Sequence, residues 1–426
     1  MSLKLTKGEW VRKFLCGLTA AGMLFTLTSC GGADSSGEST ATTTTAATEK
    51  TPATPAEFHT TAVEKSLVTY GNTARMQEKI KKAQSGAETT VAYIGGSITE
   101  GLTAGADGCY AKLTYDHFAQ TYGKGDNVKY VNAGLSGTPS ILGNMRLARD
   151  VLSKNPDIVF IEFAVNDGTE SDYQVSYESM VRTILSQDSD IAVVLLFSRL
   201  KNGYSAQDYM KNIGNYYNLP MISYADGITY LMDNGQLMWE QFSDDESHPN
   251  TDGHKLVAEM IDHYFDTVDD QPAAQPVAMP VAATISDRLM NMKLYEGLDA
   301  PSGNILTPAS AGSFVDGSSI NTFTHGWTNR IKDDDNSAAT FKFKGKIVYL
   351  IYKQVATKDF GDVTIKVKIN GTETAYNLSA VDPKGWGNPA FFSLGMEATE
   401  SGYEVTIQMA AGSEDKQFEI LGFATT

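Results

Sequence analysis

The sequence predicts an α/β domain followed by an all-β domain, and three observations support this prediction. From about residue 60 to 268, short apolar runs alternate with stretches that have the periodicity of a helix. A segment rich in proline and alanine, residues 271–281, then interrupts the pattern. After it, β-rich runs separated by turn residues continue along the chain.

The first domain is expected to contain a parallel sheet with helices on both faces. Its apolar runs lack the polar alternation of a half-exposed strand, which is typical of strands buried on both sides. The expected strands are residues 91–94, 128–131, 158–163, 191–197 and 221–222. The expected helices are residues 75–83, 110–118, 144–152 and 177–186, and a last helix whose apolar face contains Leu256, Val257, Met260, Ile261, Tyr264 and Phe265. This alternation predicts a three-layer α/β/α domain, which we place at residues 58–270.

The second domain is expected to be a β-sandwich or jelly roll at residues 285–426, after a linker at residues 271–284. Its turns are marked by Asn370-Gly371 and Ala411-Gly412-Ser413. The expected strands are residues 339–343, 347–353, 363–369, 376–378, 403–409 and 418–423.

Composition and charge exclude several classes of function. Of the 426 residues, 42% are hydrophobic and 20% are charged, which is enough to bury ordinary globular cores. Acidic residues outnumber basic ones by 51 to 34 and no basic cluster is present, so we expect no nucleic-acid partner. The three cysteines are too few for a disulfide framework and lack the spacing of a zinc site, so we expect no structural metal.

The first thirty residues have the pattern of a bacterial lipoprotein signal peptide. A cationic start precedes a mostly apolar run at residues 14–28, which is too short to span a bilayer comfortably. The run ends in Leu27-Thr28-Ser29-Cys30, which resembles the lipoprotein box and implies lipidation of Cys30. The alternative is a short anchor helix that happens to end in a cysteine.

The segment at residues 31–57 consists mostly of Ser, Thr, Ala and Gly, which cannot bury enough surface to fold. We expect a disordered tether between a membrane anchor and the domains. The protein is therefore expected to be a lipoprotein of the cell membrane, with Cys30 in the membrane and the domains on the extracellular face.

Four short motifs carry the residues that point to chemistry. The first is Gly95-Gly96-Ser97-Ile98-Thr99, directly after the expected strand at residues 91–94. Active sites of parallel sheets gather at the carboxyl ends of strands, and glycines allow a sharp turn there, so Ser97 is placed as a nucleophile. An ordinary turn capped by serine and a phosphate-binding glycine loop are the alternatives, although no GxGxxG or Walker lysine follows.

The second and third motifs also follow expected strands, so both can face Ser97 across the sheet. Gly137 ends Asn132-Ala133-Gly134-Leu135-Ser136-Gly137, and Asn166 lies in Ala164-Val165-Asn166-Asp167-Gly168. A glycine amide and an asparagine side-chain amide are suitable donors to an oxyanion. Taken singly, each motif also fits an ordinary turn.

The fourth motif is Asp245-Glu246-Ser247-His248-Pro249, just before the last expected helix. An aspartate three residues before a histidine in a turn can orient the imidazole while its other nitrogen acts as a base. Of the six histidines, only His248 lies in an expected loop with a carboxylate at this spacing.

Together, the four motifs in this order resemble the SGNH (GDSL-type) hydrolase family over residues 88–268. The resemblance implies a flavodoxin-like three-layer fold and a serine esterase that needs no cofactor or metal. It implies Ser97 as nucleophile, His248 as general base and Asp245 as the residue that orients His248. It also implies an oxyanion hole formed by the Ser97 amide, Gly137 and Asn166.

Two positions depart from the family pattern. Gly96 stands where many members have aspartate, and Ala164 stands where glycine is usual. The Gly-Gly-Ser variant looks like that of bacterial carbohydrate esterases, some of which orient the histidine with a backbone carbonyl instead of a carboxylate. The role of Asp245 is therefore open, and Asp244 and Glu246 are near enough in sequence to compete for it.

The expected function is removal of O-acetyl groups from a xylan- or mannan-like polysaccharide outside the cell, through an acyl-serine intermediate. The outward tether, the Gly-Gly-Ser variant and the appended β domain together resemble bacterial two-domain carbohydrate O-acetylesterases. A lipase, thioesterase or lysophospholipase is one alternative, although no long apolar loop marks an acyl-chain groove. A surface carbohydrate-binding lipoprotein with an inactive hydrolase domain is the other.

The β domain also carries aromatic residues that can offer flat faces to sugar rings. Core packing is the favoured interpretation of Tyr349 and Tyr352, whereas Trp327 and Trp386 lie in glycine-containing, loop-like contexts. The sequence leaves open whether this domain binds carbohydrate or completes the active site. Three arginines of the first domain are expected to be solvated surface residues: Arg146, Arg149 and Arg199.

Overall fold

The computed structural model describes residues 53–187, 190–275, 277–329 and 335–426. The expected signal peptide, Cys30 and residues 31–52 of the expected tether lie outside the described residues. Helix α1 (Pro55–Ser66) begins within the segment predicted as tether, and Thr54 and Glu57 cap its first turn reciprocally. Residues 55–57 therefore belong to a folded helix, which corrects the predicted end of the tether.

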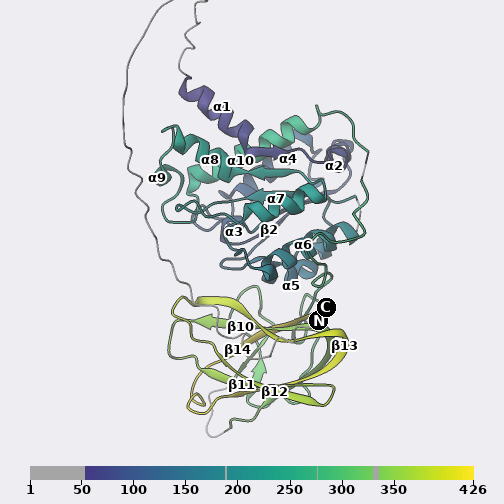
Figure 1. Ribbon diagram of the computed structural model, residues 1–426, viewed down its shortest axis with the longest axis vertical. Coiled ribbons are helices and arrows are strands. Elements are labelled where there is room, and N and C mark those ends of the chain that lie inside the picture. The colour runs from purple at the N-terminus through teal and green to yellow at the C-terminus, as the bar shows by residue number, and fades with distance from the viewer. Residues whose placement is uncertain (1–52, 188–189, 276, 330–334) are drawn as a thin grey trace, which may run out of the picture. The chain divides into compact units, whose positions relative to one another are not determined.

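The first domain is built on a six-stranded sheet in the order β1-β6-β5-β4-β2-β3 (Figure 1). The strands are β1 (Leu67–Thr69), β2 (Thr89–Gly95), β3 (Val128–Gly134), β4 (Ile158–Glu162), β5 (Ala192–Phe197) and β6 (Met221–Ser223). Strands β2 to β6 are parallel, and their order is that of a flavodoxin-like fold, which confirms the predicted fold class. The short edge strand β1, which was not predicted, pairs antiparallel with β6.

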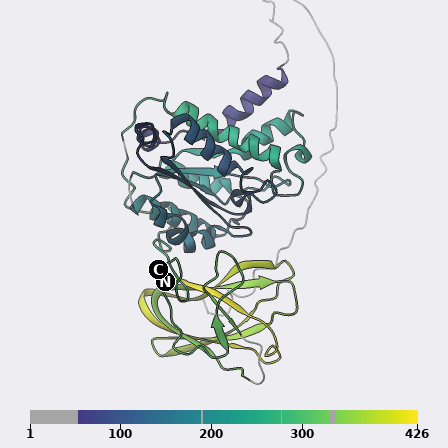
Figure 2. The ribbon, with the colours of Figure 1, turned by 180° about the vertical axis from the view of Figure 1, so that it is seen from behind.

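Helices cover both faces of this sheet, as Figures 1 and 2 show from opposite sides. One face packs against α5 (Ser140–Asp150), α6 (Ser171–Gln187) and α7 (Gln207–Tyr216). The other packs against α1, α2 (Ala74–Ser85), α4 (Tyr110–Tyr122), α8 (Tyr224–Asp233) and α10 (Thr251–Val268). Short turns complete the domain: α3 (Ser97–Glu100), η1 (Leu152–Lys154) and α9 (Trp239–Phe242). Within the described ranges, no helix combines the length and apolar character needed to cross a membrane.

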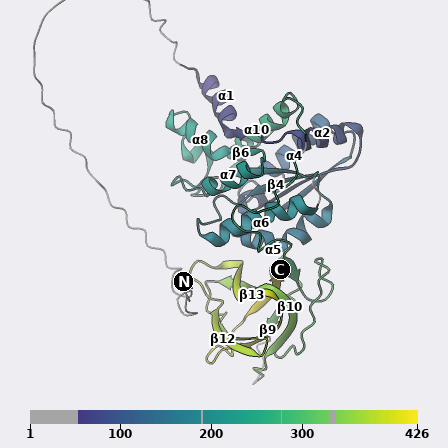
Figure 3. The same cartoon turned by 45° about the vertical axis from the view of Figure 1, so that its right-hand side comes forward.

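The second domain is an eight-stranded antiparallel sheet in the order β12-β11-β13-β10-β14-β9-β8, with β7 paired to β14 (Figure 3). Its strands are β7 (Lys293–Tyr295), β8 (Phe314–Asp316), β9 (Trp327–Asn329), β10 (Ala339–Val355), β11 (Asp362–Ile369), β12 (Thr372–Ser379), β13 (Trp386–Met409) and β14 (Glu419–Thr425). Strands from both ends of the sheet contribute side chains to one core, as expected for a sandwich. An irregularity between Gly345 and Ile347 changes the alternation of β10, so that Phe341 before it and Leu350 after it face the same core.

The second half of β10 is apolar on both sides because both sides are buried. Leu350 and Tyr352 contribute to the core of the β domain, whereas Tyr349 and Ile351 pack with Met145 of α5 and its neighbours. Tyr349 and Tyr352 are only 6% and 5% exposed, which confirms that they are packing residues.

The segment that connects the domains is held against the first domain. The Arg182 guanidinium donates hydrogen bonds of 2.9–3.1 Å to the carbonyls of residues 280–282. The buried carboxylate of Glu178 accepts hydrogen bonds of 2.6–2.9 Å from the amides of residues 284–286. The connection at residues 280–286 is therefore fixed rather than free to swing.

Glu178→Ala is expected to lower the free energy of unfolding by about 3 kcal/mol, because three backbone amides lose a buried charged acceptor. Glu178→Gln keeps one acceptor oxygen and should lose roughly half as much. Urea unfolding followed by tryptophan fluorescence measures both. An alanine variant that unfolds at the wild-type urea concentration would show that the connection needs no such acceptor.

Candidate active site

Three of the four motifs meet at the carboxyl edge of the sheet. In β2, Gly95 lies in register with Gly134 of β3 on one side and with Glu162 of β4 on the other. Ser97 follows two residues later and begins α3. This is the point where the strand order of a flavodoxin-like sheet reverses, and ligands of such folds bind outside it.

The fourth motif comes to the same place. The Oγ of Ser97 lies 2.8 Å from Nε2 of His248, and Nδ1 of His248 lies 2.7 Å from Oδ2 of Asp245. Asp244 instead accepts a 3.3 Å hydrogen bond from Asn250, and Glu246 lies 3.6 Å from Lys201. Of the three neighbouring carboxylates, Asp245 is therefore the one that contacts the ring.

The pKa of Asp245 is lower than its ordinary value. Partial burial opposes ionisation, but hydrogen bonds from the His248 ring and from the amides of His248 and Ser247 outweigh it. An ionised carboxylate at Nδ1 favours the tautomer that carries its proton there. Nε2 is then free to accept a proton from Ser97.

The loop that carries Asp245 and His248 is held by two buried side chains that the sequence analysis missed. The Trp239 indole donates a 2.6 Å hydrogen bond to the Asp245 carbonyl. The Ser243 hydroxyl donates a 2.6 Å hydrogen bond to the His248 carbonyl. Trp239 and Ser243 precede the motif by only a few residues, but nothing in their local sequence marks them as supports.

The predicted oxyanion donor Asn166 lies beside the turn that carries Ser97. The Asn166 side chain packs so closely on Gly96 that any Cβ at position 96 would collide with it. A side chain at position 96 would therefore require the Asn166 amide to move. Gly137 has a φ of 69°, a left-handed conformation that favours glycine.

The loop at residues 134–138, which we call the Gly137 loop, is tied to the nucleophile turn. Glu100, the last residue of α3, accepts a 2.8 Å hydrogen bond from the Ser136 amide and a second one from the Ser136 hydroxyl. Gly134 packs against the backbone of α3 with no room for a side chain. The positions of Ser97 and Gly137 are therefore coupled.

Two buried carboxylates lie behind the site. Glu162 accepts a 3.2 Å hydrogen bond from Thr99 and another from Ser198, and burial raises its pKa to about 7. Asp167, next to Asn166, accepts a 2.7 Å hydrogen bond from the Ser140 amide, and burial raises its pKa to about 7 as well. Glu162 therefore connects the first motif to Ser198, and Asp167 connects the third motif to the first residue of α5.

The prediction that Arg146 and Arg149 are solvated surface residues is wrong. Their exposed fractions are 1% and 7%. Arg146 donates hydrogen bonds of 3.1 Å to the Gly95 carbonyl and 2.6 Å to the Ala133 carbonyl. Spacing was the available signal, since Arg146 lies four residues after buried Leu142 and Arg149 lies four residues after buried Met145. Arg199 is half-buried and donates to the Thr229 hydroxyl.

The two candidate tryptophans of the β domain have different surroundings. Trp327 is fully buried and packs edge-on against Phe341, so it has no face for a ligand. Trp386 is 63% exposed. A Cβ built on Gly137 would lie 2.9 Å from Cζ2 of Trp386, so the indole covers the Gly137 loop.

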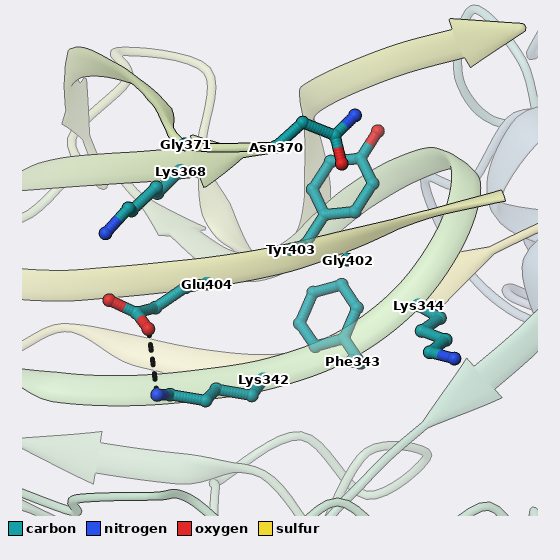
Figure 4. Close-up of a pocket in the computed structure, with 9 residues that line it drawn as sticks. All are labelled: Lys342, Phe343, Lys344, Lys368, Asn370, Gly371, Gly402, Tyr403 and Glu404. Carbon is teal, nitrogen blue, oxygen red and sulfur yellow. Dashed lines mark ion pairs between the residues drawn. The ribbon is translucent and has the colours of Figure 1, made fainter. Parts of the chain in front are cut away.

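A shallow hollow of about 450 Å³ lies elsewhere, on strands β10, β11 and β13 (Figure 4). Lys342, Lys344 and Lys368 line it, and Glu404 forms a 2.8 Å ion pair with Lys342. None of the four motifs contributes a residue to this hollow. The candidate active site is therefore the group of residues around Ser97 and not the hollow. In the part of the chain that the structure describes, no three His, Cys, Asp or Glu side chains gather as they do around a metal ion.

Comparison with known proteins agrees with this geometry. Residues 93–256, which contain all four motifs, match the model of the GDSL-like Lipase/Acylhydrolase family. Among solved structures, a two-domain esterase active on acetylated mannans matches with a TM-score of 0.73 and 26% identity, covering 85% of this chain and 98% of that chain. The corresponding structure co-crystallised with mannopentaose matches with a TM-score of 0.74 and 26% identity, covering 85% and 97%. No curated protein sequence matches the chain.

These matches agree with the class of protein that the site geometry indicates. Within the α/β domain, residues 93–256 match the GDSL-like lipase/acylhydrolase family, which fits the resemblance found in the sequence analysis. The chain is a carboxylic ester hydrolase with the architecture of a two-domain esterase.

Glu162→Gln is expected to change how stability depends on pH. Folded Glu162 keeps its proton up to about pH 7, whereas the ordinary pKa is 4.5, so raising the pH between these values favours the unfolded chain. Glutamine cannot ionise. As the pH rises from 4.5 to about 7, the free energy of unfolding of the variant should therefore increase by about 2–3 kcal/mol relative to that of the wild type, and the difference should stay constant above pH 7.

Urea unfolding of both proteins at pH 5 and pH 8 measures this difference. Both proteins also carry Asp167→Asn in this comparison, because Asp167 titrates in the same range and the Glu162 charge contributes to its raised pKa. Parallel pH dependence of the two proteins would mean that Glu162 is ionised in the folded state at neutral pH.

Proposed function

We propose that this protein is a serine esterase that removes O-acetyl groups from a mannan- or xylan-like polysaccharide. The observation that carries the proposal is the hydrogen-bonded series Ser97, His248 and Asp245, with separations of 2.8 and 2.7 Å. The similarity to an esterase active on acetylated mannans supports the substrate class, because it covers 85% of this chain and so includes parts of both domains.

The proposed reaction begins with attack of the Ser97 hydroxyl on the acetyl carbonyl carbon, while Nε2 of His248 accepts the hydroxyl proton. The carbonyl oxygen becomes an oxyanion, which the amides of Ser97 and Gly137 and the side chain of Asn166 stabilise. When the tetrahedral intermediate collapses, the bond to the sugar oxygen breaks and His248 returns the proton to that oxygen. The product is a free sugar hydroxyl and acetyl-Ser97.

The second half of the reaction restores the enzyme. Water gives a proton to His248 and attacks the acetyl-Ser97 carbonyl, and the same donors stabilise the new oxyanion. Collapse breaks the bond to Oγ of Ser97, which recovers its proton from His248, and acetate leaves. Asp245 remains ionised and stabilises the His248 imidazolium in both halves.

Trp386 supports a carbohydrate as the substrate. A flat, exposed indole beside the Gly137 loop offers a face on which a sugar ring can stack while its acetyl group reaches Ser97. We therefore assign the β domain a part in the substrate site. Nothing comparable in the described residues favours a long acyl chain.

We further propose that the enzyme works outside the cell as a membrane-anchored lipoprotein. The cationic start, the apolar run at residues 14–28 and the sequence Leu27-Thr28-Ser29-Cys30 support this location. An extracellular enzyme would meet polysaccharide rather than cytoplasmic thioesters, which agrees with the proposed substrate.

Ser97→Ala is expected to lower the turnover of p-nitrophenyl acetate by at least about 10³-fold, because the variant has no nucleophile. Rates are measured by absorbance, with acetate release from acetylated glucomannan and acetylated xylan as the polysaccharide assays. Preference for the octanoate over the acetate ester would favour the lipase alternative. If the wild type and Ser97→Ala hydrolyse p-nitrophenyl acetate at the same background rate, and both proteins bind to immobilised mannan, the carbohydrate-binding alternative is favoured.

Trp386→Ala is expected to lower kcat/KM for acetylated glucomannan about tenfold more than for p-nitrophenyl acetate, since only the polysaccharide has sugar rings to stack. Leu298→Ala is the matched control, because Leu298 is also in the β domain and 66% exposed. Equal losses on both substrates would mean that the indole acts on the Gly137 loop alone.

A further inference from the structure

Helix α5 links the Gly137 loop to the β domain. The helix begins at Ser140, shortly after the Gly137 loop. Its buried Asn144 donates a 2.8 Å hydrogen bond to the Leu289 carbonyl, and its Met145 shares a core with residues of β10. One helix therefore directly follows the loop of the predicted oxyanion donor and contacts the second domain.

Arg146 is the contact between α5 and the ends of two strands. Its guanidinium donates to the carbonyl of Gly95, which precedes the nucleophile turn, and to the carbonyl of Ala133, which precedes the Gly137 loop. The Gly95 carbonyl also accepts a 3.1 Å hydrogen bond from the Leu135 amide. The position of this guanidinium therefore affects where both loops leave the sheet.

A series of ion pairs continues from Arg146 into the β domain. Asp150 lies 3.1 Å from Nη1 of Arg146 and 2.6 Å from Nε of Arg149. Arg149 then lies 2.6 Å from Glu296, and its guanidinium stacks 4.8 Å from the centre of the Phe323 ring. Glu296 and Phe323 are fully buried. We call the four charged residues the α5 ion chain: Arg146, Asp150, Arg149 and Glu296.

The charges of the α5 ion chain balance, with two cations and two anions in a largely buried environment. Removal of the Glu296 charge leaves Arg149 with Asp150 as its remaining carboxylate partner. Asp150 is then drawn toward Arg149 and shared less with Arg146. Buried charges respond strongly to such a change because little water is present to screen them.

We propose that the β domain positions the Gly137 loop through the α5 ion chain, so that Glu296 acts on catalysis as a positioning residue. The proposal rests on the proposed esterase function for its kinetic consequence. It assigns the second domain a role that is separate from any contact of Trp386 with substrate. A small ester that is too short to reach the β domain should still depend on Glu296.

The test compares Glu296→Gln with Asp172→Asn, using p-nitrophenyl acetate as substrate. Asp172 forms a 2.7 Å ion pair with Arg288, which also connects the first domain to the chain beyond the linker but lies outside the α5 ion chain. We expect Glu296→Gln to lower kcat about three- to tenfold with KM within about twofold, because an oxyanion donor is displaced while substrate access is unchanged. Asp172→Asn should leave both constants unchanged.

A second measurement does not depend on activity. Hydrogen–deuterium exchange followed by mass spectrometry should show faster exchange at residues 134–138 in Glu296→Gln than in wild type, and no such change in Asp172→Asn. Arg146→Lys keeps the charge but cannot bridge both carbonyls, so it should lower kcat more than Glu296→Gln does. If Glu296→Gln does not fold, Arg149→Lys replaces it in both measurements, because it also alters the ion pair between Arg149 and Glu296.

The outcomes separate this proposal from the esterase proposal. If the wild type hydrolyses the ester, and Glu296→Gln has the same kcat and the same exchange at residues 134–138, the positioning role is overturned and the proposed esterase function stands. Equal effects of Glu296→Gln and Asp172→Asn overturn it too, since any loss of domain contact would then suffice. Wild type without esterase activity contradicts the proposed function, while the exchange measurement still decides the role of Glu296.

Discussion

The hydrogen bonds of the Arg146 guanidinium are the interaction on which the geometry of the site depends. Where parallel strands end and the chain turns away, their last carbonyls have fewer partners in the sheet, and the Gly95 carbonyl accepts from the Leu135 amide as well as from Arg146. Arg146 supplies donors to Gly95 and Ala133 at once, so β2 and β3 end side by side and their loops start from fixed points. In the proposed reaction, Ser97 and Gly137 can then act on the carbon and the oxygen of one carbonyl group without a costly rearrangement.

The α/β domain could be predicted from the sequence because strands buried on both faces leave continuous apolar runs, and the helices between them have clear periodicity. Of the elements that were not predicted, α7 and α8 have amphipathic patterns, whereas β1 and α1 lack such signals. β1 has three residues and no buried face, and α1 buries only Ala62, Val63 and Ser66 in a polar sequence. Their structure comes from pairing with β6 and packing on α8 and α10, which are distant in sequence.

The β domain shows where local patterns stop being informative. β10 was predicted as two strands because Gly345 and Lys346 interrupt its apolar pattern, yet the chain continues as one strand with an irregularity there. Trp327 and Trp386 have similar glycine neighbours, but Trp327 pairs with Ile420 inside the sheet while Trp386 begins β13 at a register shift. Only the strand pairing distinguishes the core residue from the exposed one.

In the candidate site, too, some residues could be proposed from the local sequence and others could not. Ser97, Asp245, His248 and Asn166 could be proposed from the sequence because each lies in a short motif after a strand or before a helix. Their supports were missed, because helical spacing is only a weak sign that an arginine of α5 is buried and nothing in the local sequence marks Glu296 as buried. Arg149 and Glu296 are 147 positions apart, and their burial exists only once the second domain packs on α5. The residues that perform the proposed chemistry are therefore encoded locally, whereas the precision of their placement depends on contacts between the two domains.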